Sequence, residues 1–558
     1  MAENIKIQFI NMKRTIIMLA ALTQFAFATV KADDVFKHDR SRWLEIAERS
    51  KPKLHKTVVY PKAVVKAVKD ASAFQGWRYE PAGKPEDVFK SNFRQVRSVT
   101  FDLGRHAVGY LSLHFKTLNN CQDAPIRVRV FCGELPAELN TPMPEKWTAG
   151  LSRAWMQDEI LTVEQMDTTV TLARRVACRY IKVDLLAESY GFDFALDGLS
   201  FTAETSAQTD RMELAETCPP EIRKIRDVAV NTLQECMQTV YEDGPKRDRR
   251  LWLGDLYLES LANMYSFQTH ELTKRCLYLF AGLSSEKGII YANSFETPKP
   301  HPQYACYLLP YNLLFISTLL EYVNATGDTT TGMDLWKVGK RQLDDALEYV
   351  GENGMFNTSH RPSWLFFDWR DGLDVNVCMQ GAMIFALNQM AELTQRLGIK
   401  EDIGKWKKLE RKLKAYALKN MYSSTRKVFL SGKDKQLSVL SQVWMIKSGV
   451  VSGKKAQTAL RTALTSAESV KPGTPYATHY VIDAMLVSGM KNEARQYMID
   501  YWGGMVKKGA DTFWEAYDPN DDFISPYRFS PLNSACHAWS CTPVYFIHKY
   551  PEIFQRAD

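Results

Sequence analysis

The chain has 558 residues, of which 45% are hydrophobic and 24% are charged, and its formal net charge at pH 7 is +7. This length predicts two to four domains, and the composition excludes a disordered chain, a collagen-like fibre and a multispan membrane protein. The 71 Lys and Arg residues are interspersed with 64 Asp and Glu residues. A nucleic-acid-binding protein concentrates its basic residues on one element, so we expect no nucleic-acid partner.

Residues 1–32 have the three-part layout of a secretory signal peptide. Lys13 and Arg14 precede an apolar run over 16–28, and small residues lead into Asp33 and Asp34. The run is shorter than the roughly 20 residues of a membrane-spanning helix, so we predict cleavage rather than anchoring. The mature chain is therefore expected in the periplasm, with no membrane span.

The ten cysteines show no metal-site spacing such as Cys-x-x-Cys. Most of them lie in apolar patterns, where a thiol behaves as a small buried hydrophobe. Cys536 and Cys541 are close enough in sequence to form a disulfide in an oxidising compartment.

Residues 33–215 have the pattern of a β-sandwich domain. Apolar and polar residues alternate with a period of two over 111–116, 126–130 and 180–185, and Gly, Pro and Asn clusters separate these segments. This period is typical of half-buried strands, and several such strands in succession favour a sandwich.

Residues 216–558 are predicted to be almost wholly helical, beginning at the double proline Pro219-Pro220. About twelve helices alternate between two kinds. The stretch 377–397 is apolar nearly all round, whereas 403–416 has one apolar stripe among Lys, Arg and Glu residues. Alternating buried and surface helices predict an (α/α)6 barrel. An α-solenoid is the alternative, but no repeat consensus is present.

Two segments of the helical region combine carboxylates with aromatic rings. The first, 241–255, is a loop with Gly and Pro that leads onto a helix, and the second is Thr512-Phe-Trp-Glu-Ala-Tyr-Asp518, with His537 beyond it. The polar and aromatic residues of the first segment are Asp243, Arg247, Asp248, Trp252 and Asp255.

Cleavage of a glycosidic bond needs a proton donor and a base or nucleophile, while aromatic rings pack on the C–H faces of the sugar. Clustered carboxylates raise the pKa of one member, and neighbouring Arg residues keep the others ionised. By spacing alone, surface ion pairs and a helix cap are the more common explanation of such a loop.

The string Asp243-Gly-Pro-Lys-Arg-Asp-Arg-Arg-Leu-Trp-Leu-Gly-Asp255 resembles the signature of glycoside hydrolase family 78, the α-L-rhamnosidases. That signature runs Asp-Cys-Pro-x-Arg-Glu, then Trp, then Gly-Asp. The segment 512–518 is similar to the family's Thr-x-Trp-Glu-x-Trp-Asp, and 102–115 is similar to the Gly motif of its β-sandwich. The resemblance therefore covers both predicted domains.

The resemblance implies that Asp248 is the general acid and that Glu515 is the general base acting on water, with inversion at the anomeric carbon. It implies no metal ion and no other cofactor. The residues implied to bind or enclose the sugar are Asp243, Arg247, Trp252, Asp255, Trp369 and His537. For Trp369, an ordinary core position is the alternative.

Two positions depart from the family pattern. Asp248 stands where better-known members carry Glu, which is one methylene longer, and Gly244 replaces the usual Cys. Little sequence follows the last predicted helix, so we expect a minimal version that lacks the C-terminal β domain of many relatives.

The sequence thus predicts an exo-acting, inverting hydrolase that releases terminal α-L-rhamnose from plant or bacterial glycans or glycosides. One alternative is another helical-barrel enzyme, such as an unsaturated glucuronyl hydrolase or a polysaccharide lyase. A second alternative is an inactive carbohydrate-binding protein, which the Asp at position 248 makes plausible. The oligomeric state cannot be inferred from the residues.

Overall fold

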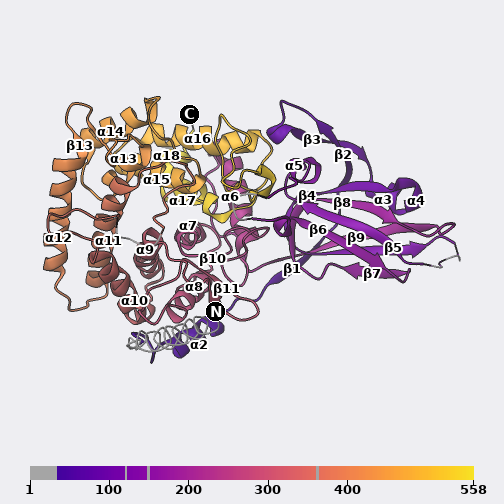
Figure 1. The fold of residues 1–558 in the computed structure, drawn as a ribbon, viewed down its shortest axis with the longest axis horizontal. Coiled ribbons are helices and arrows are strands. Elements are labelled where there is room, and N and C mark those ends of the chain that lie inside the picture. Colours follow the sequence, from indigo (N-terminus) through magenta and orange to yellow (C-terminus); the bar gives the residue numbers. More distant parts are fainter. Residues whose placement is uncertain (1–33, 120–121, 123, 148–150, 360–363, 558) are drawn as a thin grey trace, which may run out of the picture.

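A computed structural model describes residues 34–119, 122, 124–147, 151–359 and 364–557. A domain of strands and a domain of helices lie side by side (Figure 1). The predicted signal peptide, 1–32, lies outside the described residues. No helix of the described ranges is both long and apolar enough to cross a membrane.

The strand domain is one sheet, in which we find nine strands among the described residues, with the main order β1-β9-β4-β8-β5-β6. Strands β2 and β3 join it through β4, and β7 also pairs with β4. The strands are β1 His55–Val59, β2 Ala63–Lys69, β3 Trp77–Gly83, β4 Ser98–Thr117, β5 Ile126–Gly133, β6 Gln157–Val163, β7 Thr168–Thr171, β8 Val176–Ala187 and β9 Phe194–Thr205. Short helices between them are α3 Pro85–Phe89, α4 Phe93–Val96 and α5 Pro136–Asn140.

The long strand β4 connects the two halves of this folded sheet. Its first part pairs antiparallel with β2 and β8, and its second part pairs with β9 and β7. The register shifts between Asp102 and Ala107, and such a shift bends a strand. Leu111, Leu113 and Phe115 are fully buried, as the alternation in the sequence predicts.

The helical domain contains twelve main helices within the described ranges, arranged as hairpins. The helices are α6 Pro220–Cys236, α7 Leu253–Met264, α8 His270–Gly282, α9 Leu309–Thr326, α10 Thr329–Leu347, α11 Asn376–Arg396, α12 Ile403–Tyr416, α13 Val439–Lys447, α14 Gly453–Thr465, α15 Pro475–Val487, α16 Lys491–Lys507 and α17 Pro543–Lys549, and the short α18 Pro551–Phe554 follows. Short strand pairs are formed by β10 Leu251–Trp252, β11 Asn293–Phe295 and β12 His301–Pro302, and by β13 Tyr422–Ser423 and β14 Val428–Phe429.

Every second helix belongs to an inner ring. Helix α9 contacts α7 and α11, α13 contacts α11 and α15, and α17 packs on α7 to close the ring. The inner helices are buried on nearly all faces, whereas outer helices such as α10 and α12 bury one stripe. The predicted alternation and the β-plus-α fold are therefore confirmed, because a helix enclosed on all sides must be apolar all round.

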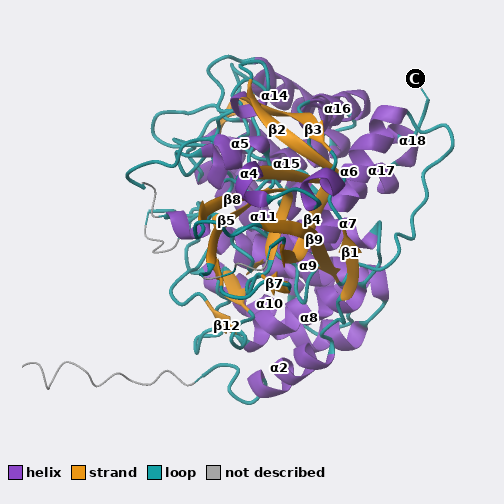
Figure 2. Cartoon of the chain, turned by 90° about the vertical axis from the view of Figure 1, so that its right-hand side faces the viewer, coloured by secondary structure: helices purple, strands orange, loops and turns teal. Residues whose placement is uncertain are grey.

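The ends of the predicted sandwich domain, 33–215, differ from the observed sheet, which runs from β1 to β9. Before it, helix α2 (Arg40–Arg49) packs on α8, and Trp43 is fully buried in the helical core. After it, Ala207 and Cys218 also belong to that core. In the view from the strand domain, the sheet lies in front of the helices (Figure 2).

The cysteine contacts differ from the pairing that sequence spacing suggests. Cys536 faces Cys236, with 3.8 Å between their sulfur atoms, and both are buried free thiols. Cys541 is also a free thiol. Cys536 therefore contacts helix α6 rather than its neighbour in sequence.

Candidate active site

All eight residues proposed from the sequence line a single cavity of about 430 Å³. The cavity lies between the loops at one end of the barrel, and a loop of the strand domain reaches it. Its lining is Leu151, Trp155, Asp243, Arg247, Asp248, Arg250, Trp252, Asp255, Gln303, Cys306, Leu308, Tyr311, Trp364, Phe366, Trp369, Glu515, Tyr527, His537 and Trp539.

The acidic loop between α6 and α7 is held by Asp243. Its carboxylate accepts hydrogen bonds from the backbone N–H of Asp248 at 3.2 Å and of Arg250 at 3.1 Å. A side chain at Gly244 would not fit this loop, because a Cβ there would lie 2.4 Å from the Arg247 carbonyl oxygen and 2.6 Å from the Ser534 hydroxyl. The glycine that departs from the family pattern thus permits close contact between two loops.

Arg247 bridges the two carboxylates proposed as acid and base. Its Nη1 lies 3.0 Å from Asp248 Oδ1, and its Nη2 donates to Glu515 Oε2 at 2.5 Å. Because one guanidinium is only about 2 Å wide between these nitrogens, the two carboxylate oxygens lie within about 8 Å of each other. Asp248 and Glu515, which are 267 positions apart in sequence, thereby face the same cavity.

Glu515 is buried and ionised. The Tyr527 hydroxyl donates to its Oε1 at 2.5 Å, and the backbone N–H of Ser534 donates to its Oε2 at 3.0 Å. Burial raises the pKa of a carboxyl, but here Arg247, His537 and Tyr527 outweigh it and lower the pKa of Glu515 to about 2. A carboxylate that stays ionised near neutral pH suits the part of a general base.

Two other carboxyls of the cavity behave in the opposite way. Burial, followed by the nearby charge of Asp248, raises the pKa of Asp243 to about 8. Burial also raises the pKa of Asp255, although His537 opposes this shift. The site therefore combines an ionised carboxylate, Glu515, with a carboxyl group, Asp243, that retains its proton near neutral pH, and acid–base catalysis requires groups in both states.

His537 and Asp255 leave polar atoms free for a ligand. Nε2 of His537 lies 3.4 Å from Oδ1 of Asp255, but neither atom, nor Nδ1 of His537, makes a hydrogen bond with the described residues. Both side chains are buried at the cavity wall. Because unsatisfied buried polar groups are costly, these atoms are suited to hydroxyl groups of a bound sugar.

Aromatic rings form the rest of the wall. Trp252 and Trp369 line it as proposed, and Trp369 lies with its ring centre 5.0 Å from Phe366 and 5.2 Å from Trp364. Trp252 and Phe366 are both in edge contact with Tyr311. Trp369 therefore contacts the buried ring of Phe366 and the exposed ring of Trp364, and it also lines the cavity.

A buried ion cluster joins the strand domain to the loops of the site. Lys246 lies 2.9 Å from Glu138 Oε1 and 3.0 Å from Glu134 Oε2, and it also donates to the Asn533 carbonyl at 2.6 Å. Glu134 in turn accepts from the Ala535 backbone N–H at 2.6 Å. The same cluster thus holds the loop with Arg247 and Asp248 and the loop with Ser534 and His537.

Several lining residues escaped the sequence analysis. Tyr527 lies twelve residues after Glu515 in a polar loop with no distinctive pattern, and Tyr311 lies in the apolar helix α9, where a core role was the natural interpretation. Trp155 comes from the strand domain. Its proximity to the acidic loop is a tertiary feature with no signal in either segment.

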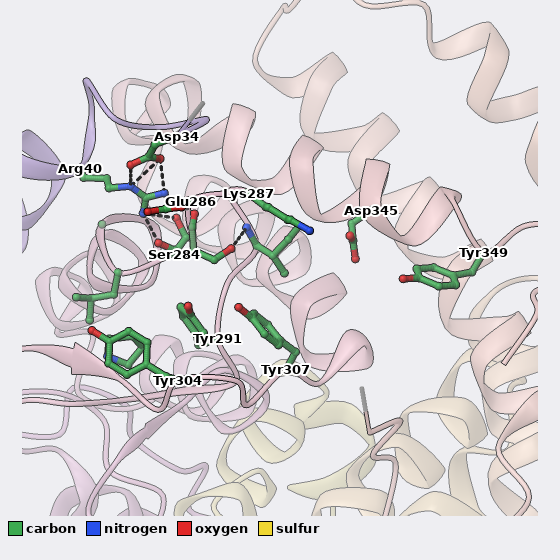
Figure 3. Close-up of a pocket in the computed structure, with 15 residues that line it drawn as sticks. Asp34, Arg40, Ser284, Glu286, Lys287, Tyr291, Tyr304, Tyr307, Asp345 and Tyr349 are labelled. Atoms are coloured by element: carbon green, nitrogen blue, oxygen red, sulfur yellow. Dashed lines mark hydrogen bonds and ion pairs between the residues drawn. The ribbon is translucent and has the colours of Figure 1, made fainter. Parts of the chain in front are cut away.

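A larger cavity, of about 770 Å³, lies on the other side of the segment 302–308. Tyr291, Tyr304 and Tyr307 line it beside an ion pair between Asp34 and Arg40 (Figure 3). None of the eight proposed residues borders this cavity. The paired carboxylates of a hydrolytic site therefore lie in the smaller cavity.

Two family models match the chain. The model described as the glycosyl hydrolase family 78 alpha-rhamnosidase N-terminal domain matches residues 61–203. The model described as the bacterial alpha-L-rhamnosidase 6 hairpin glycosidase domain matches residues 211–550. No curated protein that was searched matches the chain.

Solved structures of rhamnosidases are similar to this chain. A rhamnosidase from Klebsiella oxytoca with rhamnose bound is 36% identical, with a TM-score of 0.87, over 92% of this chain and 99% of the other. A family 78 rhamnosidase of Bacillus sp. GL1 is 19% identical, with a TM-score of 0.67, over 81% of this chain and 46% of the other. At that lower identity the likeness shows the fold alone.

Proposed function

Because the chain belongs to glycoside hydrolase family 78, the α-L-rhamnosidases, we propose that this hydrolase releases terminal α-L-rhamnose from glycans or glycosides with inversion at the anomeric carbon. The observation that carries the proposal is the bridge from Asp248 through Arg247 to Glu515 in one cavity.

In the proposed reaction, Asp248 protonates the leaving oxygen while Glu515 removes a proton from water. That water attacks the anomeric carbon from the face opposite the leaving group. The upper limit of about 8 Å between the two carboxylates is compatible with both the roughly 5 to 5.5 Å of retaining enzymes and the lower part of the roughly 6.5 to 9.5 Å range of inverting enzymes, so the proposal of inversion rests on the family resemblance. Asp255 and His537 would bind sugar hydroxyls, and Trp252 and Trp369 would enclose the ring.

The electrostatics support this division of work. Arg247 forms an ion pair with Glu515, and the low pKa of Glu515 keeps this carboxylate ionised at neutral pH. Burial and the nearby charge of Asp248 raise the pKa of Asp243 to about 8, so Asp243 keeps its proton at neutral pH. Asp248 lies between Arg247 and Arg250 at the cavity wall and is the carboxyl placed to protonate the leaving oxygen.

We expect Asp248→Asn to discriminate between leaving groups. With an alkyl or sugar aglycone, which needs protonation, kcat should fall about 100-fold or more, because general-acid assistance is lost. With 4-nitrophenyl rhamnoside, whose leaving group needs little protonation, most of the activity should remain. Steady-state kinetics on both substrates measure the difference.

An equal loss on both substrates would contradict the role of Asp248 as acid. The stereochemistry is tested separately by proton NMR of the first-formed sugar, which should be β-L-rhamnose. Prompt appearance of the α-anomer would overturn inversion.

Between pH 4 and 10, the pH profile of kcat/KM should show a single decline, on the alkaline side. We expect kcat/KM to fall above about pH 8, because Asp243, which lies beside the proposed acid, then loses its proton. Glu515 has a pKa of about 2, so its protonation should cause no limb near pH 5. A profile recorded from pH 4 to 10 tests this, and an alkaline limb below about pH 6 would contradict it.

The family matches favour hydrolysis over the lyase and inactive-protein alternatives. Hydrolysis of an aryl rhamnoside without a new ultraviolet-absorbing double bond would exclude the lyase directly. We also propose export to the periplasm, on the pattern of residues 13–34 in the sequence. Fractionation of cells that express the full chain tests that point.

A further inference from the structure

Arg250 is a fixed cation in the wall of the active-site cavity. Its backbone N–H is bound by Asp243, and its guanidinium carbon lies 4.5 Å from the ring centre of Phe295 and 5.7 Å from that of Trp155. The side chain is 15% exposed and lines the cavity. Aromatic contacts at these distances restrict the position of the guanidinium but do not neutralise its charge.

The charge of Arg250 is poorly balanced by the protein. Its Nη1 donates to the neutral amide of Gln303 at 3.1 Å and lies 3.6 Å from a carboxylate oxygen, Oδ2 of Asp248. Its Nε is enclosed and has no hydrogen-bond partner among the described residues. Arg247, by contrast, binds two carboxylates at 3.0 and 2.5 Å.

The position of Arg250 relative to Asp248 indicates which part of a substrate it meets. Oδ1 of Asp248 is held by Arg247, on the side of Glu515, where the attacking water and the rhamnose lie in the proposed reaction. Oδ2 faces Arg250. Because the proton donor adjoins the leaving oxygen, Arg250 and the neighbouring Trp155 lie on the aglycone side.

We propose that Arg250 binds the carboxylate of a uronic acid to which the terminal rhamnose is attached, with Trp155 beside the uronic acid ring. This inference deepens the proposed rhamnosidase function and rests on it. The substrate class is therefore a glycan in which rhamnose caps a hexuronic acid. A carboxylate is the natural partner for a guanidinium that lines a cavity, since the planar fork of N–H groups can donate to two oxygens.

The reaction cycle strengthens the need for such a partner. In the acid form required for catalysis Asp248 is neutral, and Arg250 then has only the Gln303 amide as a polar side-chain partner in the described structure. A substrate carboxylate would offset the positive charge beside the proton donor. Burying a cation without an anion is unfavourable, so an acidic aglycone complements this wall of the cavity better than a neutral one.

The test compares matched disaccharides on the full-length enzyme. The acidic probes are rhamnosyl-glucuronic acid and rhamnosyl-galacturonic acid, and the neutral probes are their carboxyl-reduced counterparts. We expect kcat/KM to be about 10- to 100-fold higher for at least one acidic probe, the range of one charge-assisted hydrogen bond. Arg250→Gln should bring that ratio close to one, whatever its effect on the absolute rates, and Arg250→Lys should retain part of it.

Arg153→Gln is the matched control, because Arg153 is an exposed cation close to Trp155 in sequence, is paired with Asp158, and does not line the cavity. It should keep the wild-type ratio. If neither Arg250 variant folds, inhibition of the wild type provides the test: methyl glucuronide should compete with an aryl rhamnoside, and methyl glucoside should do so at least about tenfold more weakly.

The two hypotheses fail separately. A wild-type enzyme that cleaves 4-nitrophenyl rhamnoside but does not distinguish acidic from neutral probes overturns the uronic acid assignment alone. Retention of the full preference in Arg250→Gln also overturns it. Absence of cleavage of every rhamnoside overturns the proposed function itself.

Discussion

Replacement of Glu515 by Gln is expected to lower kcat by about 10² to 10⁴-fold, the loss that follows removal of a general base. The amide is close to isosteric, so it can still accept from Arg247 and from the Ser534 N–H, and the cavity should keep its shape. It cannot take a proton from water, and its neutral form no longer balances the Arg247 charge. The loss should therefore appear in kcat, with KM changed much less.

The measurement is steady-state hydrolysis of 4-nitrophenyl rhamnoside, with circular dichroism to show that the variant folds. Tyr527→Phe is the matched control. It removes one hydrogen bond to Glu515 but leaves the carboxylate and Arg247, so its loss should be clearly smaller. Activity of Glu515→Gln within a few-fold of the wild type would exclude Glu515 as the base.

Replacement of Lys246 by Met is expected to cost about 3 to 5 kcal/mol of stability, the usual range for removal of one partner from a buried ion pair. Lys246 is almost fully enclosed between Glu134 and Glu138. Burial alone would lower its pKa, but these two carboxyls outweigh it, so the lysine is charged. Its loss leaves an uncompensated carboxylate at the boundary between the domains.

The same substitution should reduce catalysis, because Lys246 also binds the carbonyl of Asn533, next to the Ser534 that donates to Glu515. Chemical denaturation measures the stability and steady-state kinetics measure kcat. Lys508→Met is the control, since the ion pair of Lys508 with Asp522 is more exposed and should contribute no more than about 1 kcal/mol. Equal stability of the two variants would show that the buried cluster does not hold the loops.

This cluster gives the strand domain a physical part in the active site. Glu134 lies in the turn between β5 and α5 and Glu138 lies in α5, yet they fix the positions of two loops of the helical barrel. Trp155, from the same domain, lines the cavity itself. The strand domain is thus part of the catalytic unit, and a barrel expressed without it should not hold Arg247 and Ser534 in place.

Much of this organisation was readable from the sequence alone. The alternation over 111–116 predicted a half-buried strand, and the apolar stretch 377–397 predicted an inner helix, because a residue's burial pattern follows the period of its own element. The carboxylates of the segment 243–255 lie close together in the structure because they are close together in the sequence. The eight proposed residues line one cavity. The sequence could predict this because their motifs resemble those of a family in which the motifs form one site.

Only the tertiary structure decided which distant groups meet. Periodicity reports that a residue is buried, but it carries no information about its partner. The contacts of Arg247 with Glu515, of Lys246 with Glu134 and of Cys536 with Cys236 each join segments more than one hundred residues apart. The charge state of Glu515 follows from its contacts in the fold, because electrostatic energy depends on distance in space and on burial. The unpaired Nε of Arg250 and the position of Trp155 at the cavity are also properties of the tertiary structure.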